Sequence, residues 1–130
     1  MDKSNLVFIS HSLRDQEWVG EFAEELATKG IKVWLAEREI ALGEPIAGKL
    51  EEGLRTSDVL VVVLSPENIN SPCLFFDLGA ALAGGKRIIA VVDQNVPAKD
   101  LPGPIRIRRY LPKEEARETA RDVATALLAA

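Results

Sequence analysis

The sequence predicts a three-layer α/β fold, in which a parallel β-sheet is covered by helices on both faces. Short apolar runs rich in β-branched residues alternate along the chain with longer segments of helical periodicity. The runs lack regular polar alternation, as expected for strands whose two faces are both buried. Their order is βαβαβαβ, followed by a loop, a further strand and a helix, which predicts right-handed crossover connections.

Four segments have the continuous apolar character of buried strands. They are Leu6–Ser10 (LVFIS), Ile31–Ala36 (IKVWLA), Val59–Leu64 (VLVVVL) and Arg87–Val92 (RIIAVV). A fifth segment, Ile105–Leu111 (IRIRRYL), is predicted to be a short edge strand, because its arginines alternate with apolar residues. Asp93–Pro104 contains three prolines and one glycine and is expected to form a surface loop.

The segments between and after these strands are predicted to be helices. Gly30 follows the first helix, and Pro45 suits the first turn of the second. Ser71-Pro72 is expected to begin the third helix as cap and first-turn proline, and Gly84-Gly85 to end it. Lys113–Ala130 is expected to be a terminal helix that covers the sheet. The first two helices carry apolar stripes, formed by Trp18, Phe22 and Leu26 and by Ile46, Leu50 and Leu54.

Length and composition indicate one small globular domain. We expect the 130 residues to form a single domain, 1–130, which could be one module of a longer protein. The net charge of −4 argues against nucleic acid as a partner, because its binding needs clustered Lys and Arg. The single cysteine, Cys73, suits a reducing cytoplasm, and one histidine and one cysteine leave little for a zinc site. No signal peptide or membrane-spanning run is visible, so we expect a cytoplasmic location, no membrane partner and no metal.

Asp77 is the only charged residue between Glu67 and Lys86, and it lies within the third predicted helix. Its neighbours three and four positions away are apolar or small: Cys73, Leu74, Ala80 and Ala81. Burial there would raise the pKa of the carboxyl group, because desolvation disfavours the charged form. Asp77 is therefore the candidate catalytic carboxylate, and the alternatives are a solvated outer position or a carboxylate bonded to a backbone amide.

Two loops at the carboxyl ends of predicted strands are candidate binding elements, because ligands of such folds bind there. Ser10 and His11 follow the first strand and could bind ribose or phosphate, although turn and cap chemistry would explain the same residues. Ala36–Pro45 follows the second strand, and it contains no glycine-rich phosphate-binding motif. Gly43 in this loop is expected to adopt a positive φ. The loop could be a lid, a protein-contact surface or an ordinary solvated connection.

The segments VFISHSLRD, GIKVWLAEREIALGEP, SDVLVVVLSP and SPCLFFDLGAALAGGKRIIAVV, in this order, resemble a Toll/interleukin receptor (TIR) domain of the bacterial kind. The resemblance covers nearly the whole chain and implies a flavodoxin-like sheet of five parallel strands. Many bacterial and plant members cleave NAD⁺ at the nicotinamide–ribose bond, releasing ADP-ribose or a cyclic isomer, and their activity commonly needs self-association. Animal receptor and adaptor members act mainly as scaffolds.

By this resemblance Asp77 stands at the position of the family's catalytic glutamate, because the LGAALAGGK that follows it matches the end of the family's third helix. The resemblance also places Ser10, His11, Gly43 and Pro45 in the walls of the substrate pocket. Trp34, Cys73 and Phe76 are further candidates for substrate binding, although a strand tryptophan such as Trp34 is more often core. The loop through which family members associate corresponds here to Glu37, Arg38, Glu39, Ile40 and Leu42.

Three positions depart from the family pattern. Aspartate at position 77 replaces glutamate and shortens the side chain by roughly 1.5 Å, and a misplacement of that size can cost about a hundredfold in rate. Cys73 stands where tryptophan is common, and His11 stands where many members have tyrosine.

By this resemblance we expect a TIR domain that cleaves NAD⁺ through Asp77 and needs no cofactor, because NAD⁺ is the substrate. The principal alternative is a non-catalytic interaction module that associates with other TIR domains through Ala36–Pro45. A nucleoside deoxyribosyltransferase or base-exchange enzyme of related fold ranks lower, because its usual nucleotide-binding start is not visible. Antiphage immunity and interference with host signalling are expectations from the family alone.

Overall fold

The computed structural model describes residues 6–129, apart from the side chain of Glu37. One sheet contains five strands in the order β2-β1-β3-β4-β5, and every pairing is parallel. The strands are β1 (Leu6–Ser10), β2 (Lys32–Trp34), β3 (Val59–Leu64), β4 (Arg87–Val92) and β5 (Leu111–Pro112). The strand order reverses between β1 and β3, so the carboxyl end of β1 lies at the switch point where such folds bind ligands.

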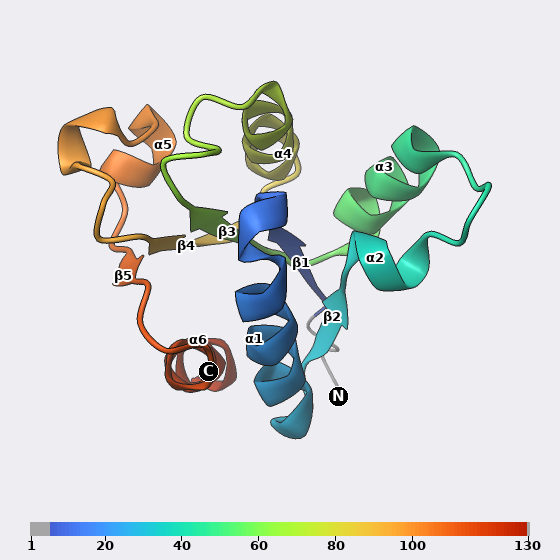
Figure 1. Ribbon diagram of the computed structural model, residues 1–130, viewed down its shortest axis with the longest axis horizontal. Coiled ribbons are helices and arrows are strands. Elements are labelled where there is room, and N and C mark those ends of the chain that lie inside the picture. The colour runs from blue at the N-terminus through green and yellow to red at the C-terminus, as the bar shows by residue number, and fades with distance from the viewer. Residues whose placement is uncertain (1–5, 130) are drawn as a thin grey trace.

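Helices cover both faces of this sheet (Figure 1). One face carries α1 (Gln16–Thr28) and α6 (Ala116–Leu128), and the other carries α3 (Ile46–Thr56), α4 (Pro72–Ala83) and α5 (Gly103–Arg106). The connections contain the four-residue helix α2 (Ala36–Glu39) and the short 3-10 helices η1 (Leu13–Asp15) and η2 (Ala98–Asp100). The predicted three-layer α/β fold with a five-stranded parallel sheet is confirmed.

Alternate residues of each strand contribute to two separate cores, because successive strand side chains point to opposite faces. Val61 and Val63 of β3 pack with Phe22 of α1, whereas Leu60 and Val62 pack on the side of α3, α4 and α5. All six residues of β3 are buried. A fully buried side chain of this kind contributes about 1.5–3 kcal/mol, so the apolar β3 anchors both helical layers.

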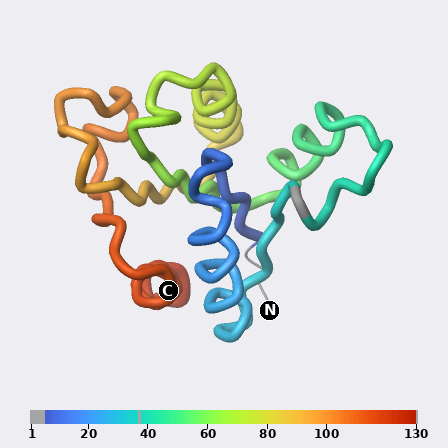
Figure 2. The backbone as a smooth tube through the Cα atoms, in the orientation of Figure 1, coloured from blue at the N-terminus to red at the C-terminus, as the bar shows by residue number. Residues whose placement is uncertain are grey.

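The edge strand is the main error of the sequence prediction. The edge strand exists, but it is only Leu111–Pro112 and not Ile105–Leu111. The predicted segment begins instead within the short helix α5, which Pro102 and the first-turn Pro104 favour. The backbone then returns through β5 to α6 on the other face (Figure 2). Ile105 is fully buried and Ile107 is 82% exposed, so the apolar residues of this segment do not line one face of a strand.

Other boundaries differ from the prediction by smaller amounts. The second strand is shorter than Ile31–Ala36, because Ala36 already begins helix α2 within the predicted loop. Asp93–Pro104 forms a surface connection, as expected, but two of its side chains, Val96 and Leu101, are buried against the sheet. Ile46 is 63% exposed, so it does not contribute to the core as its place in the apolar stripe predicted.

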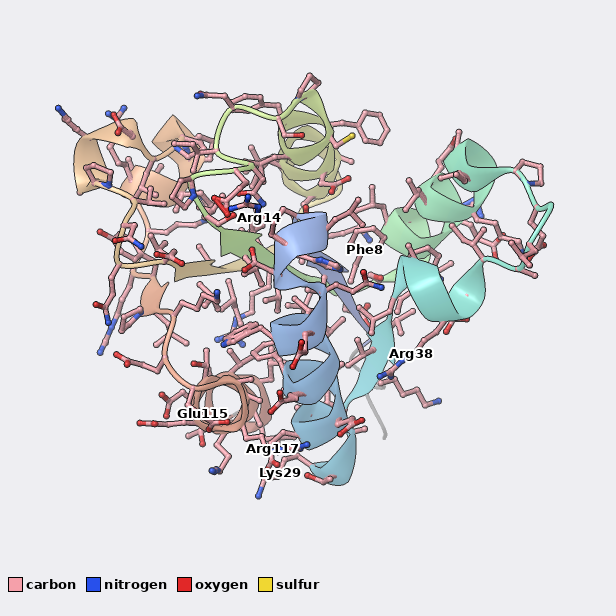
Figure 3. All side chains as sticks on the ribbon, viewed as in Figure 1. Phe8, Arg14, Lys29, Arg38, Glu115 and Arg117 are labelled. Atoms are coloured by element: carbon pink, nitrogen blue, oxygen red, sulfur yellow. The ribbon has the colours of Figure 1, made fainter. Side chains whose placement is uncertain are left out.

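Charged side chains join the two helices of the α1/α6 face. Arg117 of α6 lies 3.0 Å from Glu24 Oε1 and 3.6 Å from Glu25 Oε1 of α1 (Figure 3). Lys113, directly after β5, is more enclosed, and its Nζ lies 3.0 Å from Oδ1 of the buried Asp15. It also lies 5.2 Å from the centroid of the Trp18 ring. Lys113 therefore ties the end of β5 to the start of α1.

Lys113→Met is expected to lower the free energy of unfolding by about 2 kcal/mol, because it removes the cation nearest the buried Asp15 carboxylate. Because Lys113 keeps some contact with water, the loss in free energy of unfolding is smaller than for a fully buried ion pair. Urea denaturation near neutral pH measures the change. Lys99→Met makes the same chemical change at an exposed position and should stay within about 0.5 kcal/mol of wild type. Equal stability of the two variants would contradict a structural role for Lys113.

Candidate functional site

A pocket of about 210 Å³ opens where β1 and β2 end, beside the start of α4. It is lined by residues of β1, of the loop and the 3-10 helix η1 after it, of β2, α2 and α3, of the β3–α4 loop and of α4. Five of the predicted site residues lie in this lining: Ser10, His11, Trp34, Cys73 and Asp77. The structure thus brings together residues that are up to 67 positions apart in the sequence, from Ser10 to Asp77.

Asp77 reaches the pocket because of how α4 begins. Ser71 caps the helix by accepting a hydrogen bond from the Cys73 N–H at 3.2 Å, and Pro72 occupies the first turn, as predicted. Asp77 is half-buried. Desolvation raises the pKa of its carboxyl group above the ordinary value, and a hydrogen bond from the Ser10 side chain acts in the opposite direction. The predicted direction of this pKa shift is confirmed.

The raised pKa of Asp77 makes a prediction for stability. Between the ordinary pKa and the raised folded-state pKa, the folded protein holds a proton that the unfolded chain has released. The wild-type protein therefore loses stability as pH rises from about 4 through the folded-state pKa of Asp77. Asp77→Asn has no such loss, so its stability relative to wild type should increase from acid to neutral pH. Urea denaturation across this range tests the trend, and a constant or opposite difference would contradict the burial of Asp77.

Trp34 forms an apolar wall of the pocket and is held by two contacts. Its ring stacks on Phe8 of β1, with ring centroids 5.0 Å apart and an interplanar angle of 14° (Figure 3 labels Phe8). Gly53 of α3 lies against the indole, because a Cβ at position 53 would be only 2.5 Å from Trp34 Cε2. Trp34 is thus both part of a core cluster and part of the pocket lining.

Ser10 and His11 supply the polar groups next to Asp77. Ser10 is 8% exposed and pairs with Val62 at the end of β1, so the sheet fixes its position. The Nδ1 of His11 lies 2.9 Å from the Ser12 carbonyl oxygen. A carbonyl can only accept, so this contact places a proton on Nδ1 and orients the imidazole.

Asn68 is a pocket residue that the sequence analysis missed. It is 6% exposed and holds the loop after β3: its Oδ1 accepts from the Ser65 N–H at 2.9 Å, and its Nδ2 donates to the Val63 carbonyl at 2.9 Å. The available signal was its place in a loop at the carboxyl edge of the sheet, where ligands bind. Asn68 therefore fixes the connection that leads into α4.

Gly43, Pro45 and Phe76 do not lie in the pocket lining. Phe76 directly precedes Asp77, and adjacent helical residues point about 100° apart. Phe76 instead borders a groove of about 390 Å³ between α3 and α4. Gly43 and Pro45 lie in the exposed connection between α2 and α3, where Gly43 has the expected positive φ of 86°.

The predicted interaction loop is largely exposed. Arg38 and Glu39 are exposed, and Arg38 extends outward from α2 (Figure 3). Ile40 is partly buried, Leu42 is 105% exposed, and the Glu37 side chain lies outside what the structure describes. Within residues 6–129, no three His, Cys, Asp or Glu side chains gather as metal ligands. No helix in that part of the chain is both long and apolar enough to cross a bilayer.

The TIR domain family model matches residues 7–128 of the chain. The chain belongs to the TIR domain family. This TIR domain is 43% identical over 60 residues to the NAD(+) hydrolase TcpA of Theionarchaea archaeon (strain DG-70-1), a match covering 45% of the chain and 18% of that protein. It is 30% identical over 99 residues to the 2′ cyclic ADP-D-ribose synthase AbTIR of Acinetobacter baumannii (strain 1295743), covering 73% of the chain and 37% of the relative.

A solved structure agrees with the fold of this TIR domain. The TIR domain of the Toll-related receptor TRR-2 from Hydra magnipapillata superposes with a TM-score of 0.71 at 23% sequence identity. The superposition covers 94% of this chain and 93% of that one. The matches to TcpA and AbTIR, by contrast, span well under half the length of those two relatives.

Proposed function

We propose that this TIR domain cleaves NAD⁺ at the nicotinamide–ribose bond, with Asp77 as the catalytic carboxylate. The observation that carries the proposal is the placement of a partly desolvated Asp77 beside Ser10, His11 and Trp34 in a pocket at the switch point of the sheet. Two relatives, named an NAD(+) hydrolase and a 2′ cyclic ADP-D-ribose synthase, support it.

The chemistry needs one well-placed negative charge. Breaking the bond between the ribose C1′ and the nicotinamide nitrogen returns the electron pair to nicotinamide, which leaves neutral, and the positive charge develops on the ribose. An ionised Asp77 stabilises this charge electrostatically, more strongly where water is partly excluded. The role parallels that of the carboxylates in glycoside hydrolysis. Water then adds to C1′ and loses a proton to give ADP-ribose, or a hydroxyl of the same molecule adds to give a cyclic product.

The size of the pocket suggests how much of NAD⁺ it holds. At about 210 Å³ it is smaller than the roughly 300–1,000 Å³ of typical ligand cavities. We assign it to the nicotinamide and its ribose, while the adenosine end extends beyond it. Self-association would then complete the enclosure, so turnover per chain should rise with protein concentration. A turnover per chain that stays flat across the range in which the chain associates would reject this role of association.

The direct test incubates the purified chain with NAD⁺ at high protein concentration and separates the products by chromatography. Release of nicotinamide together with ADP-ribose or a cyclic isomer is expected. A second readout uses Cys73, the single cysteine, which lies exposed in the pocket lining. NAD⁺ should slow its reaction with a maleimide. No release of nicotinamide, under conditions in which the chain self-associates, would reject the proposed activity.

A non-catalytic interaction module is the second candidate, and the exposure of Leu42 favours it. A large apolar side chain that is 105% exposed buries nothing within the chain and is available to a partner. Self-association through this loop is also compatible with the first proposal, because NAD⁺ cleavage that depends on assembly would need the same contact.

Leu42→Ser is expected to weaken self-association by about tenfold without changing the melting temperature, because the side chain contributes no buried area to the fold. Sedimentation equilibrium measures the association constant. Ile107→Ser makes a matched change at another exposed position, 82% exposed, and should leave association unchanged. An unaltered association constant for Leu42→Ser would show that the loop is not the contact.

A further inference from the structure

A second pocket, of about 600 Å³, lies between the start of β4, the segment leading into β5, and α6. All strands are parallel, so their amino ends lie together on one side of the sheet and their carboxyl ends on the other. The start of β4 therefore lies at the opposite end of the strands from the end of β1 and the Asp77 pocket. The volume falls within the roughly 300–1,000 Å³ typical of small-molecule sites. This basic-edge pocket is therefore large enough for a ligand of its own.

The lining of the basic-edge pocket concentrates positive charge on a chain whose net charge is −4. Asp122 is its one acidic residue, and Tyr110 its one aromatic residue. The basic residues in the lining are Lys86, Arg87, Arg108 and Arg109. Such a concave basic surface attracts anions more strongly than the same charges spread over a flat face.

Two of these cations are engaged within the fold and two are not. The Lys86 ammonium donates to the carbonyls of Arg55 and Ser57, and Arg108 Nη1 donates to the Pro104 carbonyl at 2.6 Å. In the part of the chain that the structure describes, no ion pair or side-chain hydrogen bond occupies the guanidinium of Arg87 or Arg109. Their donors are thus available to a ligand.

The backbone of β4 adds a further donor at this edge. The Arg87 N–H donates to the Asp58 carbonyl at 3.3 Å, on the side of β3. Main-chain N–H groups point to alternate sides along a strand, so the Ile88 N–H points away from β3. β5 is only two residues long and pairs with Val91 and Val92. No strand therefore lies beside Ile88 on that side of β4.

We propose that the basic-edge pocket binds a nucleotide that carries a diphosphate. The guanidinium groups of Arg87 and Arg109 match phosphate oxygens in geometry and charge, and the Ile88 N–H supplies a neutral donor beside them. Tyr110 offers an aromatic surface to the base. The one acid, Asp122, suits the ribose hydroxyls, which donate hydrogen bonds to carboxylates in other nucleotide sites. This site is independent of the proposed cleavage at Asp77.

The test titrates ADP into the intact chain and follows binding by isothermal calorimetry. Saturable binding tighter than about 1 mM is expected, weakening as salt is added. Inorganic pyrophosphate should bind the same site more weakly, because it lacks the base. Arg87→Gln and Arg109→Gln should each weaken ADP binding by at least about tenfold. Both side chains are exposed, so the variants should fold, which backbone NMR shifts would verify.

Two control variants show whether ADP binds in the basic-edge pocket. Arg106→Gln removes the same charge from an exposed residue outside the lining and should leave ADP affinity unchanged. Asp77→Asn should also leave the ADP affinity unchanged, because the Asp77 pocket lies at the opposite end of the strands. No saturable binding below about 1 mM, an equal loss with Arg106→Gln, or a loss with Asp77→Asn would each overturn the proposal. Tighter binding of a glutamate-rich peptide than of ADP would overturn it in favour of a docking edge for an acidic segment.

Discussion

Asp77→Asn is expected to reduce NAD⁺ cleavage by about a thousandfold or more while leaving the chain folded. The amide has nearly the same shape as the carboxyl group but carries no charge, so it cannot stabilise the positive ribose of the transition state. The loss should fall on kcat, with little change in KM, because the charge on the ribose exists only in the transition state. Steady-state kinetics of nicotinamide release measure both constants.

A matched control makes this result specific. Asp100→Asn makes the same substitution at an exposed residue in η2 and should retain full activity. Since Asp77→Asn removes a desolvated charge, the inactive variant should be at least as stable as wild type near neutral pH. Loss of activity with retained or increased stability separates a catalytic from a structural carboxylate. Wild-type turnover in Asp77→Asn would refute the catalytic role outright.

Asp77→Glu tests whether the short side chain limits the proposed NAD⁺ cleavage. Glutamate extends the carboxylate by roughly 1.5 Å toward the pocket. If the bound ribose lies beyond the reach of aspartate, activity should rise, by up to about a hundredfold. A large gain from a low baseline would mark a weakened enzyme, whereas no activity in either form would favour the interaction module.

The parts of this molecule that could be predicted from sequence are those decided by local pattern. β3 and β4 have the bounds expected from their apolar runs, and the Ser71 cap and Pro72 fixed the start of α4. Asp77 stood out because it is a lone charge in an apolar helix. The shift in its pKa followed from that setting, since burial by neighbouring apolar residues disfavours the charge.

The parts that could not be predicted depend on contacts between distant segments. The alternation in Ile105–Leu111 suggested a strand, but the prolines before it and the burial of Ile105 decided for a helix. Asn68 is an ordinary loop residue until the fold places it against β3 and the pocket. Gly53 of α3 gave no local signal, because its need for a hydrogen side chain comes from Trp34, which lies in strand β2.

Gly53→Ala is accordingly expected to have the largest effect on stability, lowering the free energy of unfolding by about 3 kcal/mol. The new Cβ would meet three atoms of the Trp34 ring at 2.5, 2.6 and 2.9 Å, closer than packed carbon atoms approach. Either the indole moves and loses its stacking on Phe8, or α3 moves away from the sheet. Both responses change the wall of the Asp77 pocket, so the efficiency of NAD⁺ cleavage should fall by at least about tenfold.

The same substitution elsewhere in α3 provides the control. Gly48 is exposed, and a Cβ there would meet no atom within 4 Å. Gly48→Ala should therefore stabilise the protein by about 0.5–1 kcal/mol, the normal preference of a helix for alanine. Urea denaturation compares the two variants, and adding Trp34→Leu to Gly53→Ala should recover part of the lost stability, because the smaller side chain makes room for the methyl group. If Gly53→Ala instead stabilised the chain as Gly48→Ala does, α3 would not pack directly against Trp34. The contact between Gly53 and the indole, which fixes this wall of the Asp77 pocket, would then be contradicted.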